Sequence, residues 1–274
     1  NRQPISIRYR GYFADQVSNT PIHNEDPSYG VSATISTKGT FLSSTANWYP
    51  RIKAENIRYQ LQVSAPAGTE AISSGQRISR QNDRENATSC WQIDYPLYGL
   101  TLSAGPYQVF ENLDGHIPIY AYFYADSAQF ATLYLRAARE YMDLYERLFG
   151  PYPFHKFAVV ENFFPTGYGL PSWALLGSSV IRLPFIVKTS LGHEMAHSWW
   201  GTGVRVDYSQ GNWCEGLTTY VADYLYKEQT SAVEALEYRL KILRDYAVLV
   251  AAESEFPLSQ FSSRHDRASQ SIGY

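Results

Sequence analysis

The change in sequence pattern near residue 125 constrains the fold of this chain most. Before it, short runs rich in β-branched and aromatic residues alternate with clusters of Gly, Pro, Asn and Ser, which is typical of antiparallel strands joined by turns. After it, apolar residues recur at three- and four-residue steps, the period of helices. The pattern predicts an α+β chain with a β-sheet domain over 1–125 and a mostly helical domain over 126–274. The expected strands of the first part are VSATIST (31–37), NIRYQLQVSA (56–65), SCWQIDYPL (89–97) and IPIYAYFYA (117–125).

Helices and two more strands are expected in the second part. Asp126 or Ser127 can cap a first helix that ends at Gly150, before Pro151. Its apolar positions are Phe130, Leu133, Ala137, Tyr141, Leu144 and Leu148. The expected strands are KFAVVENFF (156–164) and ALLGSSVIRL (174–183), and the later helices are TSLGHEMAHSWW (189–200), about 212–227, and one that SAVE (231–234) opens as a capping box.

Composition excludes several classes of function. A chain of 274 residues that is 45% hydrophobic can bury one large core or two smaller ones. A net charge of −3 without a run of like charges predicts that the chain does not bind nucleic acid. No apolar run approaches the roughly 20 residues that cross a bilayer. Cys90 and Cys214 cannot define a disulfide framework.

The N-terminus NRQPISIRYR has neither a start methionine nor the pattern of a signal peptide. We therefore expect the chain to be a piece of a longer protein. An excised domain of this kind favours an extracytoplasmic location. The sequence does not indicate an oligomeric state.

The stretch TSLGHEMAHSWWG (189–201) predicts a metal site. Residues four apart lie on one face of a helix, so His193 and His197 can bind one ion, and Glu194, about 100° round the helix, can reach a water on that ion. A catalytic zinc site takes a third protein ligand, for which Glu215 at the start of the next helix is the candidate. Gly216 within that helix costs ~1 kcal/mol against alanine, which suggests a close approach of two helices there.

The alternative is a pair of structural histidines on a solvated helix face. The helical context and the following Glu-Gly pair favour the site with one zinc ion instead. His23, His116, His155 and His265 lack ligand spacing and are interpreted as surface or hydrogen-bonded residues. Trp173, Trp199 and Trp200 suggest aromatic contacts with a substrate, although most aromatic residues in such a domain belong to the core.

GHEMAHSWWG (192–201) followed by CEGLTTYVADYL (214–225) resembles the aminopeptidase N family of gluzincin zinc peptidases, which includes the leukotriene hydrolases. NWYPRIKAENIRYQLQVSAPAGTEAISSGQ (47–76) and PLYGLTLSAGPYQVFE (96–111) are similar to parts of that family's N-terminal β-domain. The resemblance implies a saddle-like β-domain that lacks its first strands, followed by the front portion of a thermolysin-like catalytic domain. It therefore implies a chain truncated at both ends.

The resemblance also implies roles for single residues. His193, His197 and Glu215 correspond to the zinc ligands and Glu194 to the general base. Zinc lowers the pKa of its bound water, and Glu194 takes the proton and passes it to the leaving amine. Tyr274, in SIGY at 271–274, corresponds to the tyrosine that stabilises the developing negative oxygen.

Three departures from the family pattern concern the site. Seventeen residues separate His197 from Glu215 where the family usually has eighteen, and we expect the connecting loop TGVRVDYSQGNWC (202–214) to absorb the difference. Gly211 replaces the Asp usual in that loop. The family carries a G-x-M-E-N motif upstream of the zinc helix. In PTGYGLPSWALLGSS (165–179), Gly169 and Leu170 occupy the positions of the Glu and the Asn of that motif.

In the family, the Glu of this motif holds the α-amino group of the substrate. Without it, we expect weak dependence on a free N-terminus, since a buried ammonium loses its partner. Glu161 could substitute by another route, but an ordinary solvated or hydrogen-bonded carboxylate is the simpler interpretation.

The expected function is zinc-dependent hydrolysis of a peptide or protein. Gly167, Tyr168, Gly169 and Leu170 are expected to let an extended substrate lie along a strand edge, because the glycines lack side chains. The alternative is a non-catalytic peptide- or protein-binding module on a peptidase scaffold. Retention of Glu194 argues against it, because a structural zinc site needs no base.

Overall fold

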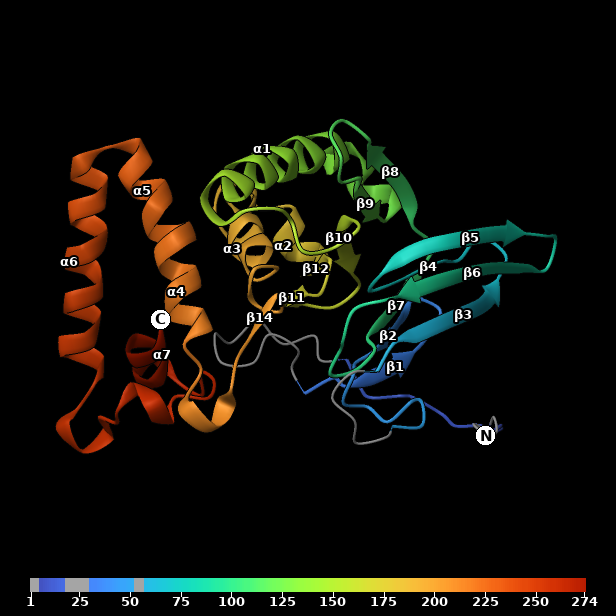
Figure 1. Cartoon of the computed structure of the whole chain (residues 1–274), viewed down its shortest axis with the longest axis horizontal. Helices are drawn as coiled ribbons and strands as arrows, with labels where there is room; N and C mark the ends of the chain where they lie inside the picture. The colour runs from blue at the N-terminus through green and yellow to red at the C-terminus, as the bar shows by residue number, and fades with distance from the viewer. Residues whose placement is uncertain (1–4, 18–29, 52–56) are drawn as a thin grey trace.

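The computed structural model describes residues 5–17, 30–51 and 57–274, and His23 lies outside these ranges. Strands occupy the first part and most helices the second, as the α+β prediction requires (Figure 1). Two antiparallel sheets have the orders β1-β2-β7-β4 and β3-β6-β5. Their strands are β1 (Ala33–Ile35), β2 (Thr40–Leu42), β3 (Tyr59–Pro66), β4 (Glu70–Ser73), β5 (Gln76–Asn82), β6 (Asn86–Ile93) and β7 (Leu102–Gly105).

A third sheet of five strands supports the site. Its order is β11-β12-β10-β9-β8, with parallel pairing of β9 to β10 and of β10 to β12, and antiparallel pairing at both edges. The segment IPIYAYFYA was expected in an antiparallel sheet of the first part, but β9 pairs in parallel with β10 because a long helix connects them. The strands are β8 (Gln108–Asn112), β9 (Ile119–Phe123), β10 (Phe157–Asn162), β11 (Gly167–Leu170) and β12 (Trp173–Gly177).

This sheet therefore includes strands from both sides of residue 125. The change in sequence pattern coincides with the start of the helices and not with an edge between sheets. The division into domains 1–125 and 126–274 stays a prediction.

Both faces of the central strands β9, β10 and β12 are buried, which explains why these strands are almost continuously apolar. Alternate residues point to opposite faces: Phe157 and Val159 pack among the helices, whereas Ala158 and Val160 pack against the N-terminal sheets. The molecule thus has a helical layer, this sheet, and a layer of N-terminal strands (Figure 1).

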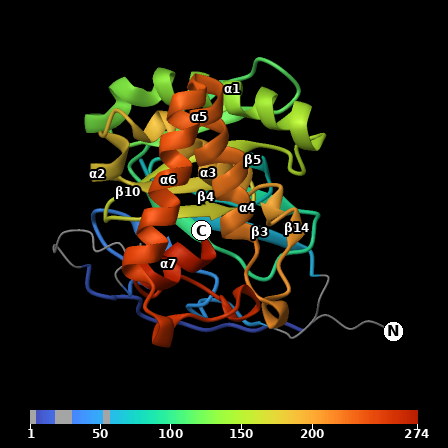
Figure 2. The same cartoon turned by 90° about the vertical axis from the view of Figure 1, so that its left-hand side faces the viewer.

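The helices follow one another through the second part of the chain, and α4, α5 and α6 stand together at the side opposite the N-terminal sheets (Figures 1 and 2). Their bounds are η1 (Ala125–Phe130), α1 (Ala131–Phe149), α2 (Ser178–Ile181), η2 (Ile186–Lys188), α3 (Ser190–Ala196), η3 (Tyr208–Gln210), α4 (Cys214–Thr219), the π-helix η4 (Tyr220–Tyr224), α5 (Leu225–Thr230), α6 (Ala232–Leu249), η5 (Ala252–Ser254), η6 (Leu258–Gln260) and α7 (Arg267–Gly273). The two-residue strands β13 (Trp200–Gly201) and β14 (Val204–Arg205) pair with each other.

The first long helix ends at Gly150 as expected, with a φ of 88° at that glycine. Its buried face differs from the prediction: Leu133 and Leu148 are 40% and 50% exposed, because tyrosines and alanines supply the core contacts. The predicted side-chain cap is also wrong, since the Ser127 hydroxyl donates to Glu161 instead. The buried residues of α1 are Ala131, Tyr134, Leu135, Ala137, Ala138, Met142 and Tyr145.

Two further expectations need correction. The predicted strand ALLGSSVIRL ends at Gly177, and Ser178–Ile181 turns into α2. Ser231 caps α6 by accepting from the Glu234 N–H at 3.1 Å, as SAVE indicates. The Glu234 carboxylate accepts from Lys227 at 3.0 Å, so it forms an ion pair where the capping box was expected. Among the described residues, no helix combines the length and the apolar character that crossing a membrane needs.

Candidate metal centre and cleft

Two helices bring the three expected metal donors together. His193 lies on α3 and His197 immediately after it, while Glu215 lies on the first turn of α4. The Nε2 atoms of His193 and His197 are 3.6 Å and 3.5 Å from Oε2 of Glu215. One donor atom from each residue lies within 4.8 Å of the others. This spacing suits a single ion held by two imidazoles and a carboxylate.

The outer nitrogens of both rings have partners that fix their orientation. Nδ1 of His193 lies 2.7 Å from Oδ2 of Asp223, and Nδ1 of His197 lies 3.1 Å from the Trp200 carbonyl oxygen, to which it can donate. Both Nε2 atoms therefore remain directed at Glu215 with their lone pairs available.

Asp223 was not identified from the sequence. It lies eight residues after Glu215, which would put it about 80° away on a regular α-helix. The π-helix Tyr220–Tyr224 changes the helical phase between them, so both carboxylates reach His193. π-helical turns are common at functional sites, but no simple sequence pattern predicts them.

The electrostatics of the donor set favour a positive charge between the three side chains. Burial opposes a charge on His193, but its contacts with Asp223 and Glu215 outweigh this and raise its pKa to about 9. Burial likewise opposes a charge on His197, yet contacts with Cys214 and Glu215 raise the pKa of His197 well above its usual value. Burial acts to raise the pKa of Glu215, but both imidazoles outweigh it and hold that pKa far below its usual range. A divalent cation fits this environment.

The loop between the second histidine and the third donor absorbs the shorter spacing, because Glu215 still reaches both rings. Gly211 in this loop has a φ of 89°, and a Cβ there would lie 2.6 Å from the Leu258 carbonyl oxygen. The backbone therefore leaves no room for an Asp at position 211. The support for the histidine rings comes from Asp223 and Trp200 instead.

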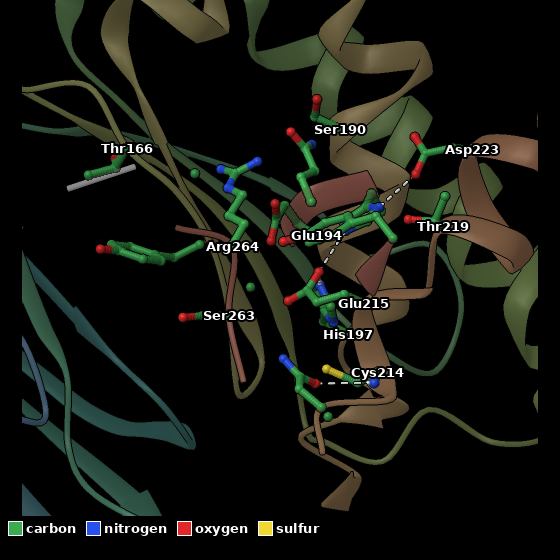
Figure 3. Close-up of a pocket in the computed structure, with 18 of the residues that line it drawn as sticks. Thr166, Ser190, Glu194, His197, Cys214, Glu215, Thr219, Asp223, Ser263 and Arg264 are labelled. Carbon is green, nitrogen blue, oxygen red and sulfur yellow. Dashed lines mark hydrogen bonds and ion pairs between the residues drawn. The ribbon is translucent and has the colours of Figure 1, made fainter. Parts of the chain in front are cut away.

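Glu194 lies beside the donor set and is half-buried at the cleft (Figure 3). Burial raises its pKa, and the nearby charges of His197 and His193 act in the opposite direction. A carboxylate with a raised pKa is suited to accept a proton and give it up again. Strand β11 lies directly against it, since a Cβ on Gly169 would be 2.9 Å from Oε2 of Glu194.

Tyr274 reaches the metal centre from the end of α7. Its ring stacks on that of His193, with centroids 6.5 Å apart and planes at 7°. Gly216 makes this approach possible, because a Cβ there would lie 3.1 Å from the Gly273 carbonyl oxygen. The expected close approach at Gly216 therefore exists, but the neighbour is α7 and not the zinc helix.

A cleft of about 1080 Å³ surrounds these residues. Of the four expected substrate-binding residues, Gly167, Tyr168 and Gly169 line it. Leu170 does not line it and packs against the core that joins the sheets, on the same face of β11 as Tyr168.

The expected aromatic lining is wrong for the three tryptophans. Trp173 is fully buried, Trp199 is buried, and Trp200 packs against the helical core. Glu161 is also fully buried, and it accepts from the Tyr124 N–H and the Ser127 hydroxyl, each at 2.8 Å. It is therefore a hydrogen-bonded structural carboxylate and not a solvated one.

The remaining described histidines are partnered or exposed, as interpreted from the sequence. His116 lies 3.0 Å from Glu146, and His155 lies 3.1 Å from Asp94. His265 is exposed and lines the cleft. The neighbouring Arg264, which was not identified as a site residue from the sequence, also lines it. Arg264 precedes α7, and its side chain reaches into the cleft (Figure 3).

Comparison with known proteins supports the fold. No family model matches the chain. Human aminopeptidase RNPEPL1 is 24% identical over 209 residues, which is 69% of this chain and 28% of that protein. An M1 zinc metallopeptidase variant from Deinococcus radiodurans bound to a Tyr-Ser-Ala substrate aligns with a TM-score of 0.63 and 16% identity, covering 93% of this chain and 59% of its own. A two-domain M1 zinc metallopeptidase variant bound to L-arginine aligns with a TM-score of 0.60 and 17% identity, covering 85% and 54%.

The chain therefore has the fold of the M1 zinc metallopeptidases, and the resemblance to this aminopeptidase family is confirmed. It spans little more than half the length of these solved structures and 28% of the human relative.

Proposed function

We propose that this chain is a zinc-dependent hydrolase of peptide bonds, in which His193, His197 and Glu215 hold one zinc ion. The convergence of these three donors, with Glu194 beside them in a large cleft, carries the proposal. Zinc bound there would act as a Lewis acid that activates water and polarises the substrate carbonyl.

The residues of the chain have separate tasks in this proposal. Glu194 accepts a proton from the attacking water and delivers it to the leaving amine, for which its raised pKa suits it. Tyr274 donates its hydroxyl hydrogen to the oxygen on which negative charge develops. Burial is the main cause of the raised pKa of Tyr274, so the Tyr274 hydroxyl keeps its hydrogen at neutral pH. Asp223 keeps the His193 ring in place.

Strand β11 binds the substrate backbone in this proposal. It is an edge strand, so one side of its backbone is not paired within the sheet. Because Gly169 touches Glu194, a peptide lying along this strand is held close to the base. The same contact leaves no room for a Glu side chain at position 169. We therefore propose that cleavage does not require a free N-terminus.

The test is hydrolysis of fluorogenic peptides, each in a free and an N-acetylated form, by the zinc-loaded chain. We expect both forms to be cleaved, and we expect Glu194→Gln to lower kcat about 10²- to 10⁴-fold while zinc stays bound. Glu140→Gln, an exposed change on α1, is the matched control and should have no effect. Cleavage of free peptides alone would mean that another group holds the amine. If neither form is cleaved, or if Glu194→Gln changes nothing, the chain is not this peptidase and a binding module becomes the better explanation.

A further inference from the structure

The charges that line the cleft do not suit a substrate ammonium group. Its described lining contains three carboxylates, those of Glu194, Glu215 and Asp223. Glu215 and Asp223 contact the histidine rings, and Glu194 lies beside them as the proposed base. Gly169, at the position of the family's amine-binding Glu, has Glu194 and His197 within 3.0 Å of where a Cβ would be. No described carboxylate of the lining is thus left to bind an amine.

Arg264 gives the same cleft an unused positive charge. Its side chain is half-buried, and its guanidinium lies 5.9 Å from the centre of the Tyr274 ring. Among the described residues, no carboxylate lies within 4.0 Å of this guanidinium. A partly desolvated arginine without an acidic partner is a strong site for an anion, because its planar fork matches the two oxygens of a carboxylate.

The position of Arg264 links this charge to the reaction site. The Tyr274 ring, over which the Arg264 guanidinium lies, stacks on His193, and Arg264 lines the same cleft as Glu194. Because Arg264 and Glu194 both line this cleft (Figure 3), a group bound at Arg264 would lie near the scissile bond of a peptide on β11.

We propose that Arg264 binds a carboxylate of the substrate, so that the cleft selects peptides by a negative charge close to the scissile bond. This inference rests on the proposed function and names its substrate class. Two groups of a peptide offer the same chemistry: the C-terminal α-carboxylate and an Asp or Glu side chain.

Binding without turnover tests the inference separately from the proposed function. The zinc-loaded Glu194→Gln chain is titrated in a calorimeter with three N-acetylated peptides of equal length. One is neutral with a C-terminal amide, one has a free C-terminal carboxylate, and one is amidated with Glu in place of Gln. We expect one carboxylate peptide to bind about 10- to 100-fold more tightly than the neutral one, the usual effect of a charge-assisted hydrogen bond. The peptide that binds more tightly shows whether Arg264 binds the C-terminal carboxylate or an acidic side chain.

Variants in the same background assign the effect to Arg264. Arg264→Gln should reduce the ratio of carboxylate to neutral affinity to about one, Arg264→Lys should keep part of it, and the exposed Arg267→Gln should keep all of it. Equal binding of the three peptides, binding of none, or a ratio that survives Arg264→Gln overturns the inference. Selective binding through Arg264 by a chain that cleaves no peptide would refute the peptidase proposal alone, whereas cleavage without charge selection would refute this inference alone.

Discussion

At the scale of single residues, Asp223 determines which nitrogen of His193 faces the other donors. Its Oδ2 lies 2.7 Å from Nδ1 of His193, so the proton of the neutral ring stays on that side and the Nε2 lone pair points into the site. The Trp200 backbone carbonyl orients the His197 ring in the same way. A backbone partner cannot be removed by substitution, but Asp223 can.

We expect Asp223→Asn to weaken zinc binding about 10- to 100-fold, the usual effect of losing a carboxylate behind a histidine ligand. The measurement is a competition titration with a chelator of known affinity. Glu228→Gln, an exposed change on α5, is the charge-matched control and should leave affinity unchanged. Equal affinity of Asp223→Asn and the parent chain would show that the ring needs no such support.

At the scale of elements, the distance between β11 and α3 would decide how a substrate meets the proposed base Glu194. The two elements pack so closely that Gly169 has the Glu194 side chain and backbone at 2.9 Å and 3.1 Å from a virtual Cβ. Gly167, two residues earlier on the same strand and also at the cleft, has nothing within 4 Å. Strand β11 therefore packs tightly against α3 at Gly169 and leaves free space at Gly167.

This difference gives a matched pair of variants. We expect Gly169→Ala to lower kcat about 10²-fold, because the methyl group must displace the Glu194 carboxylate, and a misplacement of about 1 Å can have that effect. Zinc affinity should also fall, since the methyl group would lie 3.0 Å from Cβ of His197, one of the proposed zinc ligands. Gly167→Ala, measured in the same peptide assay, should retain its kcat. A Gly169→Ala variant with full activity would show that β11 does not set the position of the base.

At the scale of the whole molecule, one core joins the N-terminal sheets to the five-stranded sheet, and Lys156 is buried at this junction. Its Nζ lies 5.4 Å from the centre of the Trp91 ring on β6 and donates to the Ser172 hydroxyl at 2.9 Å, in the turn between β11 and β12. Burial first, and Arg77 second, lower the pKa of Lys156 to about 7.

The buried lysine makes stability depend on pH. Its pKa is lower in the folded chain than in the unfolded chain, so between about pH 7 and 10 the unfolded chain binds more protons, and stability rises with pH. We expect Lys156→Met to be the more stable variant at pH 7, and its advantage in free energy of unfolding to shrink by about 2 kcal/mol between pH 7 and 9. Urea denaturation at both values measures this, with the exposed Lys38→Met as control. An advantage that does not change with pH would show that the pKa of Lys156 is not lowered in the folded chain.

Local patterns predicted much of the architecture correctly. The strands at residues 56–65 and 89–97, the end of the first long helix at Gly150, and the cap at Ser231 follow from turn residues, alternation and capping chemistry, which act over a few residues. The buried face of α1 and the end of β12 at Gly177 were predicted wrongly. In each case the partner across the core, and not the local period, decides which residues are buried.

The sequence by itself determined the candidate donors on one helix and the candidate base, because two histidines four residues apart share a helix face wherever that helix lies, and the adjacent Glu keeps a fixed position relative to them. It also determined that position 169 has no side chain to hold an amine. The tertiary structure alone decided that Glu215 reaches both rings, that Asp223 and a backbone carbonyl orient them, and that Arg264 enters the cleft. These residues come from separate elements, and their meeting depends on how helices pack and on a π-helical turn, which no local sequence pattern encodes.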